Sequence, residues 1–439
     1  MILLVYSSDS SPRLEYTLDL VFKILLSLDY QLIHDRGQFQ QATVPKINFS
    51  RSRISEAEIF IPSSQLLFES GIKNHAINVF QTDGRPAFFQ ARVPGADFPF
   101  DLFGMVFYLV SRYEEYTTNP KDNHQRFPAS ASLAFQRQFL QQPLVNQWTI
   151  ALAERLKQKF PGLVVPKSPF QFCPTYDVDL AWAFLHRPWW RTLGGLIKTA
   201  VAGHLRELQQ RIAVQTGKVN DPFFTFPYLR QLHQPQQIKP AFFFLLGDYG
   251  PFDKNIPYDH PALRQLIQEL LPWAERIGIH PSYRSNAEPE RIAVEKKRLE
   301  QILQQPVLHS RQHFLKLNLP TTYRRLLAAG IQHDHTMGYA DQVGFRASIA
   351  TPFRWYDLAK EQATGLWIHP FQVMDVTLKQ YLKLKPEEVL PYLQPMITSC
   401  REVGGQFSTL WHNSSFSELE GWAPWKGIYE KLVAALVKT

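Results

Sequence analysis

Residues 170–179 read FQFCPTYDVD, an apolar run that ends in two aspartates, Asp177 and Asp179. The apolar part predicts a buried β-strand, since short apolar runs bounded by turn signals are typical of core strands. Carboxylates at the end of a strand in a parallel barrel usually serve chemistry. One carboxylate can hold a metal ion while the other accepts a proton. An isolated Asp-x-Asp pair also caps helices, so the interpretation depends on the rest of the chain.

Beyond this strand, short apolar runs alternate with helical patterns. The runs that read as strands are residues 241–246, 277–280, 306–309, 330–333, 344–347, 366–369 and 407–411. Helical periodicity lies between most of them, over residues 261–276, 288–304 and 386–402. Repeated βα units predict either a parallel barrel or a doubly wound sheet. About eight strands in roughly 270 residues favour the barrel, so the expected fold class is α/β with a distorted (β/α) barrel.

The chain of 439 residues is too long for one ordinary domain. Nine of the ten tryptophans and eleven of the fourteen histidines lie beyond residue 165, which places a boundary there. Residues 1–165 predict a small α/β domain of unknown role, and residues 166–439 predict the barrel, with a helical basic insertion at about 181–225. The elements expected in the first domain are strands near 2–6, 57–62 and 76–80 and helices over 12–28 and 102–113. The charged run 112–116 is expected at a solvated or interdomain helix end.

The composition is that of a globular protein, with 45% hydrophobic and 20% charged residues. No run of about 18 apolar residues is present, and the apolar N-terminus is too short for a signal peptide. Two distant cysteines, Cys173 and Cys400, exclude a disulfide scaffold and fit a reducing compartment. We therefore expect a cytoplasmic protein, either free or peripheral to the inner membrane. No nucleic-acid-binding module accompanies the net charge of +8, so nucleic acid is not an expected partner.

Polar side chains follow most of the expected barrel strands at the point where each strand ends. They are Asp177 and Asp179, His280, His309 with Arg311 and His313, His333 with Asp334 and His335, Asp375, and His412. A single histidine at a strand end is more often structural than catalytic, but the ends of barrel strands converge on one cleft. Aspartate and neutral imidazole bind zinc and other divalent first-row metals well. A metal lowers the pKa of a bound water, and a second carboxylate can accept its proton.

These residues resemble the motifs of the NodB-type polysaccharide deacetylases, carbohydrate esterase family 4, over roughly residues 168–415. That family has a distorted (β/α) barrel and removes acetyl groups from glycans with a divalent metal. Residues 175–179 (TYDVD) are similar to its first motif with one residue inserted. The resemblance implies that Asp177 is the catalytic base and that Asp179 is a metal ligand.

The remaining motifs of the family are matched in order along the chain. The run ending in His280 resembles the second motif, which implies that His280 is a metal ligand. Arg311 resembles the arginine of the third motif, and Asp375 resembles the aspartate of the fourth, which orients that arginine. The hydrophobic run ending in His412 resembles the last motif, whose histidine is the general acid. The implied activity is hydrolysis of acetyl groups on a glycan or aminosugar, with zinc as the expected metal.

More narrowly, the phrases TYDVD, IHPSY, RQHFL, TMGYA and GFRA, in that order, are similar to a bacterial subgroup with a short N-terminal domain before the barrel. The chain departs from the second motif at one position, because the second metal histidine should fall where the chain has Arg284. We expect His313 to replace it, since it lies two residues past Arg311 on a neighbouring strand end. His335 and His333 are the weaker alternatives.

Two other functions stay open on the sequence alone. A barrel without its third metal ligand would be a catalytically inactive carbohydrate-binding protein. A hydrolase of another C–N bond could use Asp177 and His412 without a metal. The first of these alternatives rests on the arginine at position 284.

The basic insertion carries a second expectation, about partners. Residues 187–218 hold six lysines and arginines against one acid, Glu207, and tryptophans lie at 182, 189 and 190. Such a segment can lie on an anionic membrane surface, where the protein would meet a lipid-linked sugar. Packing as a lid against the cleft is the alternative. The expected partner is therefore a glycan or lipid-linked sugar substrate, with peripheral membrane contact through 187–218.

Overall fold

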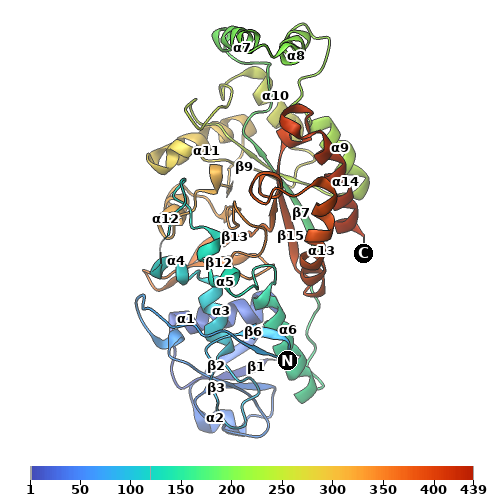
Figure 1. Cartoon of the computed structure of the whole chain (residues 1–439). Coiled ribbons are helices and arrows are strands. Elements are labelled where there is room, and N and C mark those ends of the chain that lie inside the picture. Colours follow the sequence, from blue (N-terminus) through green and yellow to red (C-terminus); the bar gives the residue numbers. More distant parts are fainter. Residues whose placement is uncertain (1, 119, 439) are drawn as a thin grey trace.

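The computed structural model describes residues 2–118 and 120–438 and contains two main sheets (Figure 1). The N-terminal sheet has four parallel strands in the order β2-β1-β3-β4. Its strands are β1 (Leu3–Tyr6), β2 (Tyr30–Ile33), β3 (Lys46–Ser50) and β4 (Ile59–Pro62). Helix α1 (Pro12–Leu18) begins after Ser11, whose side chain accepts a hydrogen bond from the Leu14 N–H. The helix continues with π geometry over Asp19–Leu25, so the helix expected over 12–28 ends at Leu25.

Within its described residues, the rest of the N-terminal part contains a small hairpin and five α-helices. These are β5 (Phe80–Thr82), β6 (Arg85–Ala87), α2 (Arg36–Gln41), α3 (Leu102–Val110), α4 (Glu114–Thr117), α5 (Leu133–Gln136) and α6 (Leu144–Lys159). Helix α3 is buried along its whole length, and its N-cap Asp101 accepts a hydrogen bond from the Gly104 N–H at 2.7 Å. A helix that is apolar on every side is typical of a core position.

The main sheet has nine strands in the order β12-β13-β11-β10-β9-β8-β7-β15-β14. They are β7 (Gln171–Val178), β8 (Ala241–Phe244), β9 (Arg276–Ile279), β10 (His309–Ser310), β11 (His333–Asp334), β12 (Phe353–Asp357), β13 (Gln362–Ile368), β14 (Val373–Met374) and β15 (Gln406–His412). All neighbours are parallel except β12 and β13, which pair antiparallel. The carboxyl ends of the parallel strands therefore share one edge.

The sheet does not close into the expected barrel within the described residues, because β12 and β14 remain its two edges. The strand expected over 344–347 is instead part of a buried loop between β11 and β12. Gly344 has a φ of +140°, and a Cβ there would meet the Leu140 carbonyl oxygen at 2.5 Å. This loop reaches the edge of the main sheet that is formed by β14. There the Gly344 N–H donates to the carbonyl of Gln372, the residue before β14, at 2.9 Å. A loop thus occupies the place of the strand pairing that would complete a barrel.

Helices pack around the main sheet between its strands, as the alternating pattern predicts (Figure 1). They are α9 (Phe226–His233), α10 (Pro261–Leu270), α11 (Glu290–Leu303), α12 (Thr321–Ala328), α13 (Pro386–Glu402) and α14 (Ala423–Val437). Between β7 and β8, the helices α7 (Trp189–Val201) and α8 (Leu205–Gln215) form a hairpin that projects away from the sheet. None of the helices in the described ranges combines the length and apolar character that a membrane crossing requires.

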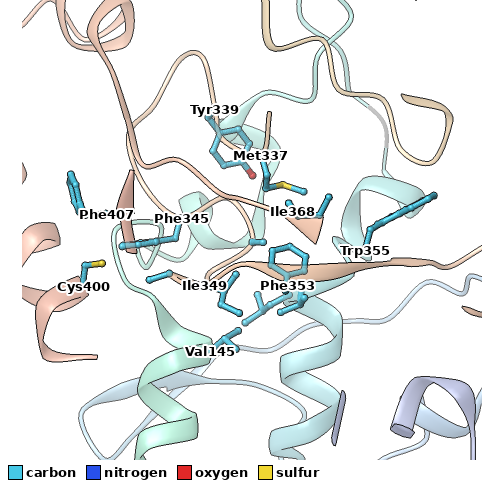
Figure 2. Close-up of a cluster of buried hydrophobic side chains, with 14 of the residues drawn as sticks. Val145, Met337, Tyr339, Phe345, Ile349, Phe353, Trp355, Ile368, Cys400 and Phe407 are labelled. Carbon is cyan, nitrogen blue, oxygen red and sulfur yellow. The ribbon is translucent and has the colours of Figure 1, made fainter. Parts of the chain in front are cut away.

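The N-terminal part and the main sheet share one hydrophobic core. Figure 2 shows Val145 of α6 beside Ile349 and Phe353 of the main part. Polar contacts cross the same boundary, since the Ala350 N–H donates to Oδ1 of Asn146 at 2.9 Å. A buried ion pair also crosses this boundary between the N-terminal part and the main sheet. The charged run at 112–116 is therefore interdomain rather than solvated, because Arg112 is buried and Nη2 of Arg346 lies 2.7 Å from Oε2 of Glu115.

Candidate metal and catalytic centre

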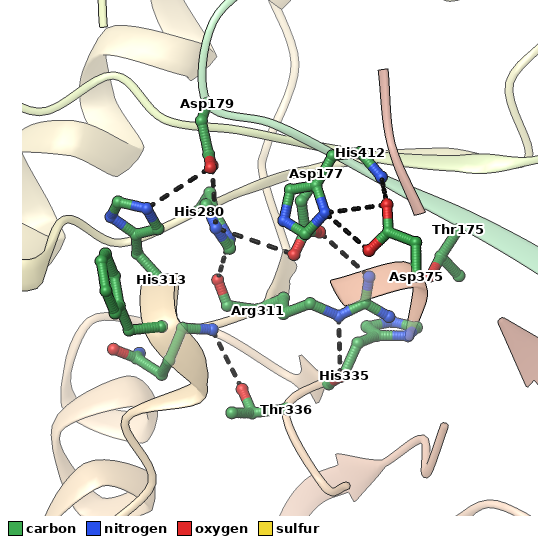
Figure 3. Close-up of polar contacts among 12 residues, drawn as sticks. Thr175, Asp177, Asp179, His280, Arg311, His313, His335, Thr336, Asp375 and His412 are labelled. Carbon is green, nitrogen blue, oxygen red and sulfur yellow. Dashed lines mark hydrogen bonds and ion pairs between the residues drawn. The ribbon is translucent and has the colours of Figure 1, made fainter. Parts of the chain in front are cut away.

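Seven of the polar residues singled out in the sequence gather at the carboxyl edge of the main sheet (Figure 3). They are supplied by the ends of five strands, with Asp177 and Asp179 at β7, His280 at β9, Arg311 and His313 after β10, Asp375 after β14, and His412 at β15. Asp177 and His412 are directly paired in the β7–β15 register. Parallel pairing places these residues on one edge, although they are separated by up to 235 positions (412 minus 177).

Asp179, His280 and His313 form the candidate metal site. One ligand atom from each residue lies within 4.8 Å of the other two. Nε2 of His280 is 3.3 Å from Oδ1 of Asp179, and Nε2 of His313 is 3.5 Å from Oδ2 of the same carboxylate. Both imidazoles are buried, whereas the Asp179 side chain is partly open. The structure therefore brings together the three residues that were expected to bind the metal.

Each imidazole is held through the ring nitrogen that faces away from Asp179. Nδ1 of His280 donates to the Arg311 carbonyl at 2.7 Å, and Nδ1 of His313 lies 2.9 Å from Oδ1 of buried Asp253. A neutral ring with its proton on Nδ1 presents the lone pair of Nε2, and such outer hydrogen bonds orient metal-binding histidines. Oδ1 of Asp179 is buried and has no hydrogen-bond partner among the described residues. This donor set fits a divalent first-row metal.

The charges at this site favour a cation. Burial acts to raise the pKa of Asp179, but the charge of His313 and contacts with both histidines outweigh it and hold the pKa well below its usual range. Burial acts to lower the pKa of His313, but Asp179 and Asp253 outweigh it and raise the pKa to about 9. A proton or a metal ion between these groups is therefore electrostatically favourable.

Arg284, which stands where the resemblance predicts a second metal histidine, does not join the site. Its Nε lies 2.7 Å from Oε1 of Glu288, and its side chain is 54% exposed. The guanidinium charge is therefore screened by solvent and paired with an acid outside the site. His313 is the residue that stands beside Asp179 and His280.

Asp177 is a buried carboxylate held by a buried arginine. Nη1 of Arg311 donates to Oδ1 of Asp177 at 3.0 Å, and Nε of Arg311 donates to the His335 carbonyl at 2.9 Å. The guanidinium also lies over the Phe243 ring at 4.6 Å. Burial lowers the pKa of Arg311, and the charge of Asp177 acts against that shift. Oδ2 of Asp177 faces the candidate metal site, 3.7 Å from Nε2 of His280.

Asp375 contacts His412 and not Arg311, which corrects the role implied by the resemblance. Nδ1 of His412 lies 3.0 Å from Oδ1 of Asp375, and Oδ2 accepts hydrogen bonds from the His412 N–H at 2.7 Å and from Oγ of Ser415 at 2.5 Å. The strand order is the physical reason. Asp375 follows β14, which pairs with β15, whereas Arg311 follows β10 on the other side of β7. Burial lowers the pKa of His412, but Asp375 outweighs it and raises the pKa to about 10.

The metal trio, Asp177 and His412 line one cavity of about 370 Å³. Two further lining residues, His124 and Arg126, come from the N-terminal part, to which the sequence assigned no role. Arg126 donates to the Phe314 carbonyl at 3.0 Å and to the Tyr381 hydroxyl at 3.1 Å, so it links three segments of the wall. Residues 124–126 belong to no local sequence motif. Their place in the cavity wall can be identified only from the fold.

His335 and His333, the weaker alternatives for the third ligand, lie away from the trio. Nε2 of His335 is 3.2 Å from Nδ1 of His309, and Nδ1 of His333 is 3.0 Å from Nε2 of His369. The four rings form two stacked pairs, His309 with His333 and His335 with His369. His335 and His369 also line a second cavity, near the amino ends of the strands. Burial lowers the pKa of His309 to about 3, which keeps this ring neutral.

Comparison with known proteins gives partial matches. Residues 3–161 match a family of unknown function, DUF7033. No curated protein matches the chain. Among solved structures, a putative polysaccharide deacetylase from Mycobacterium smegmatis is similar with a TM-score of 0.41 and 14% identity, over 62% of this chain and 86% of that one.

Two other solved structures are similar to a comparable degree. Puue allantoinase has a TM-score of 0.39 and 12% identity, over 63% of this chain and 86% of that one. A probable polysaccharide deacetylase from Pseudomonas aeruginosa has a TM-score of 0.39 and 10% identity, over 60% and 85% of the two chains.

Proposed function

We propose that the protein is a metal-dependent hydrolase that removes acetyl groups from a glycan or aminosugar. One observation carries the proposal: a single cavity of about 370 Å³ is lined by an Asp-His-His trio, a carboxylate and a histidine. The carboxylate, Asp177, is held by Arg311, and the histidine, His412, is held by Asp375. Such pairs of differently held titratable groups are typical of acid–base catalysis.

Asp179, His280 and His313 are the residues that would hold the metal, most suitably zinc. Three protein ligands leave positions open for a water and for a substrate oxygen. When bound, the ion would supply Lewis acidity toward the acyl carbonyl and a lowered pKa for the attacking water. The outer contacts of the two histidines keep both Nε2 atoms turned toward Asp179.

Asp177 is positioned to act as the general base. Its Oδ1 accepts a hydrogen bond from Arg311, which leaves Oδ2 free on the side of the metal trio. As the water oxygen attacks the acyl carbon, Oδ2 accepts the proton that the water loses. Arg311 keeps the carboxylate in place and balances its charge in a buried setting.

His412 is positioned to act as the general acid, since it lines the same cavity as Asp177. Its Nδ1 is engaged by Asp375, so Nε2 carries the proton that can be given away. When the bond between the acyl carbon and the sugar nitrogen or oxygen breaks, that proton neutralises the leaving amine or hydroxyl. The products are acetate and the deacetylated sugar, and the proton on Asp177 passes to His412, directly or through solvent, which restores both groups.

The cavity wall also suits an acetyl group. Leu315, Met374 and Val376 contribute apolar surface, and Tyr381 with Arg126 contributes polar groups at the rim. An apolar wall of this size favours the methyl group of an acetyl over a charged substituent. The acetylated sugar is therefore the substrate class that agrees best with the lining.

The test is acetate release from N-acetylated and O-acetylated oligosaccharides by the purified full chain. We expect activity that is lost on chelation and restored by zinc, and loss of both bound metal and activity in Asp179→Ala and His280→Ala. His204→Ala, a change at an exposed histidine of α8's N-cap, is the matched control and should keep both. Undiminished acetate release after chelation, with no bound metal, would instead assign the reaction to Asp177 and His412 alone.

A further inference from the structure

The α7–α8 hairpin follows the Asp177 and Asp179 pair along the chain, but none of its residues lines the candidate active-site cavity. It lies in the connection from β7 to β8, and Trp189 follows Asp179 by ten residues (189 minus 179). Since Asp179 marks the carboxyl edge of the main sheet, the hairpin emerges at the same edge as the cavity. Figure 1 shows α7 and α8 projecting from the end of the molecule opposite the N-terminal sheet.

Exposed apolar side chains are concentrated on this hairpin. Of the eighteen exposed large apolar side chains in the described residues, eight lie within residues 189–219. These eight are Trp189, Trp190, Leu193, Ile197, Val201, Leu205, Ile212 and Val219. Trp189 is 73% exposed and Trp190 is 60% exposed. Because single exposed apolar residues are ordinary but a contiguous patch is not, this cluster indicates a binding surface.

The apolar face of α7 is turned away from α8. Trp189, Leu193 and Ile197 recur every fourth residue and share one side of the helix. The other side packs on the second helix, since Thr199 is buried and a Cβ at Gly195 would meet Nη1 of Arg211 at 3.0 Å. An amphipathic helix with one free apolar face and tryptophans at its end is suited to the boundary between lipid headgroups and acyl chains.

The charge of the hairpin is positive and largely unpaired. Lys198, Arg206 and Lys218 are exposed, and no acid lies within salt-bridge distance of them among the described residues. Glu207 is the acid of this segment and pairs with Arg211 at 2.7 Å. Free cations next to an apolar face are complementary to anionic lipid headgroups.

A cavity of mixed charge lies at the foot of the hairpin. Its volume is about 450 Å³, and it is lined by Arg187, Arg206 and Arg211 together with Glu207, Glu418 and Glu420. Nε of Arg187 is buried and has no hydrogen-bond partner in the described part of the chain. Burial lowers the pKa of Arg187, and the nearby charges of Arg191 and Arg211 lower it further. A phosphate group here would meet a donor that the protein itself leaves unsatisfied.

We propose that the α7–α8 hairpin docks the protein onto an anionic lipid bilayer. The apolar face of α7 lies at the level of the headgroups, and Lys198, Arg206 and Lys218 contact lipid phosphates. Docking brings the carboxyl edge of the main sheet, and with it the cavity, to the membrane side. A consequence, which rests on the proposed function, is that the acetylated sugar is carried on a lipid. The docking itself does not depend on that function.

The test is flotation of the full chain with vesicles that contain no sugar. We expect binding to phosphatidylcholine vesicles that contain phosphatidylglycerol, weaker binding to phosphatidylcholine alone, and a further loss at high salt. The double variant Trp189→Ser/Ile197→Ser should bind about tenfold or more weakly, because it removes two of the apolar side chains from the interface. The matched control Ile72→Ser/Val164→Ser removes exposed apolar side chains elsewhere and should bind as the unmodified chain does.

Two outcomes would overturn the proposal. One is equal flotation of the hairpin variant and the unmodified chain, with circular dichroism showing that both are folded. The other is a concentration-dependent dimer in sedimentation that Trp189→Ser/Ile197→Ser abolishes, without any binding to anionic vesicles. That result would assign the apolar face to a second copy of this chain. Because the vesicles carry no substrate, neither outcome depends on acetate release.

Discussion

Nδ1 of His412, the last residue of β15, lies 3.0 Å from Oδ1 of Asp375, which follows the neighbouring strand β14. The contact decides which nitrogen of His412 faces the cavity and keeps the ring charged. Because Asp375 is fully buried, its charge is felt strongly by the imidazole. The result is a pKa of about 10 for His412, against the burial that acts to lower it.

Replacing Asp375 by Asn should move the pH dependence of the reaction. In the unmodified chain, His412 keeps its proton at every pH below about 10. Without the carboxylate charge, the pKa of His412 should fall toward its ordinary value of about 6.5. The value of kcat should then decrease about tenfold per pH unit above that pKa, while remaining measurable at lower pH. A pH profile of kcat for Asp375→Asn that matches the unmodified chain would contradict the assignment of His412 as the acid.

Replacing Asp253 by Asn should weaken metal binding without removing a ligand. Asp253 accepts from the Tyr283 N–H at 2.8 Å and faces Nδ1 of His313 at 2.9 Å. Loss of such an outer contact typically lowers metal affinity about 10–100-fold. Competition with a chromophoric chelator measures the change. The control is Asp259→Asn, which alters an exposed carboxylate in the same loop; equal affinities of the two variants would exclude a role of Asp253 in holding His313.

Replacing Arg311 by Met should destabilise the fold more than removing the whole ion pair. The single change leaves Asp177 buried without its partner, which typically costs about 3–5 kcal/mol. The double variant Asp177→Asn/Arg311→Met also removes the buried carboxylate charge. It should therefore regain more than half of the free energy of unfolding that the single variant loses. Denaturant titrations give both values, with Arg284→Met at an exposed position expected to change stability by about 0.5 kcal/mol or less. A double variant less stable than the single one would refute this account of the pair.

Replacing Arg126 by Ala should reveal the N-terminal contribution to the site. The side chain connects Asp122, the Phe314 carbonyl and the Tyr381 hydroxyl at 2.7, 3.0 and 3.1 Å. Its loss should loosen the cavity wall and raise KM about tenfold, with a smaller effect on kcat because the acid, base and metal ligands stay in place. Arg137→Ala, at an exposed position, is the control. Unchanged KM in Arg126→Ala would mean that Arg126 does not shape the substrate site.

The sequence predicted which residues meet at the site better than it predicted their contacts. Asp179, His280 and His313 could be selected because strand ends in a parallel sheet meet at one edge. The partner of Asp375 could not be selected, because it depends on β14 pairing with β15, and strand order is not written in local patterns. The place of Arg126 in the cavity wall was also missed, since it depends on how the N-terminal part packs on the main sheet.

The prediction of a closed barrel was wrong for a similar reason, because strand pairing cannot be identified from local patterns. The apolar run at 344–347 has the composition of a core strand, and its residues Phe345 and Ala347 are indeed buried. Burial does not require strand pairing, however, and the turn at Gly344 directs the backbone hydrogen bond to Gln372 instead. Hydrophobicity thus predicted where this segment lies but not how its backbone is bonded.

The most direct test of the central claim is anomalous diffraction from crystals of the full chain grown with zinc. We expect one strong peak coordinated by a carboxylate oxygen of Asp179 and by Nε2 of both His280 and His313, at about 2.0–2.2 Å. Crystals of Asp179→Ala should lack that peak. A trio that stays free of zinc while the metal binds elsewhere, for example among His309, His333, His335 and His369, would contradict the account.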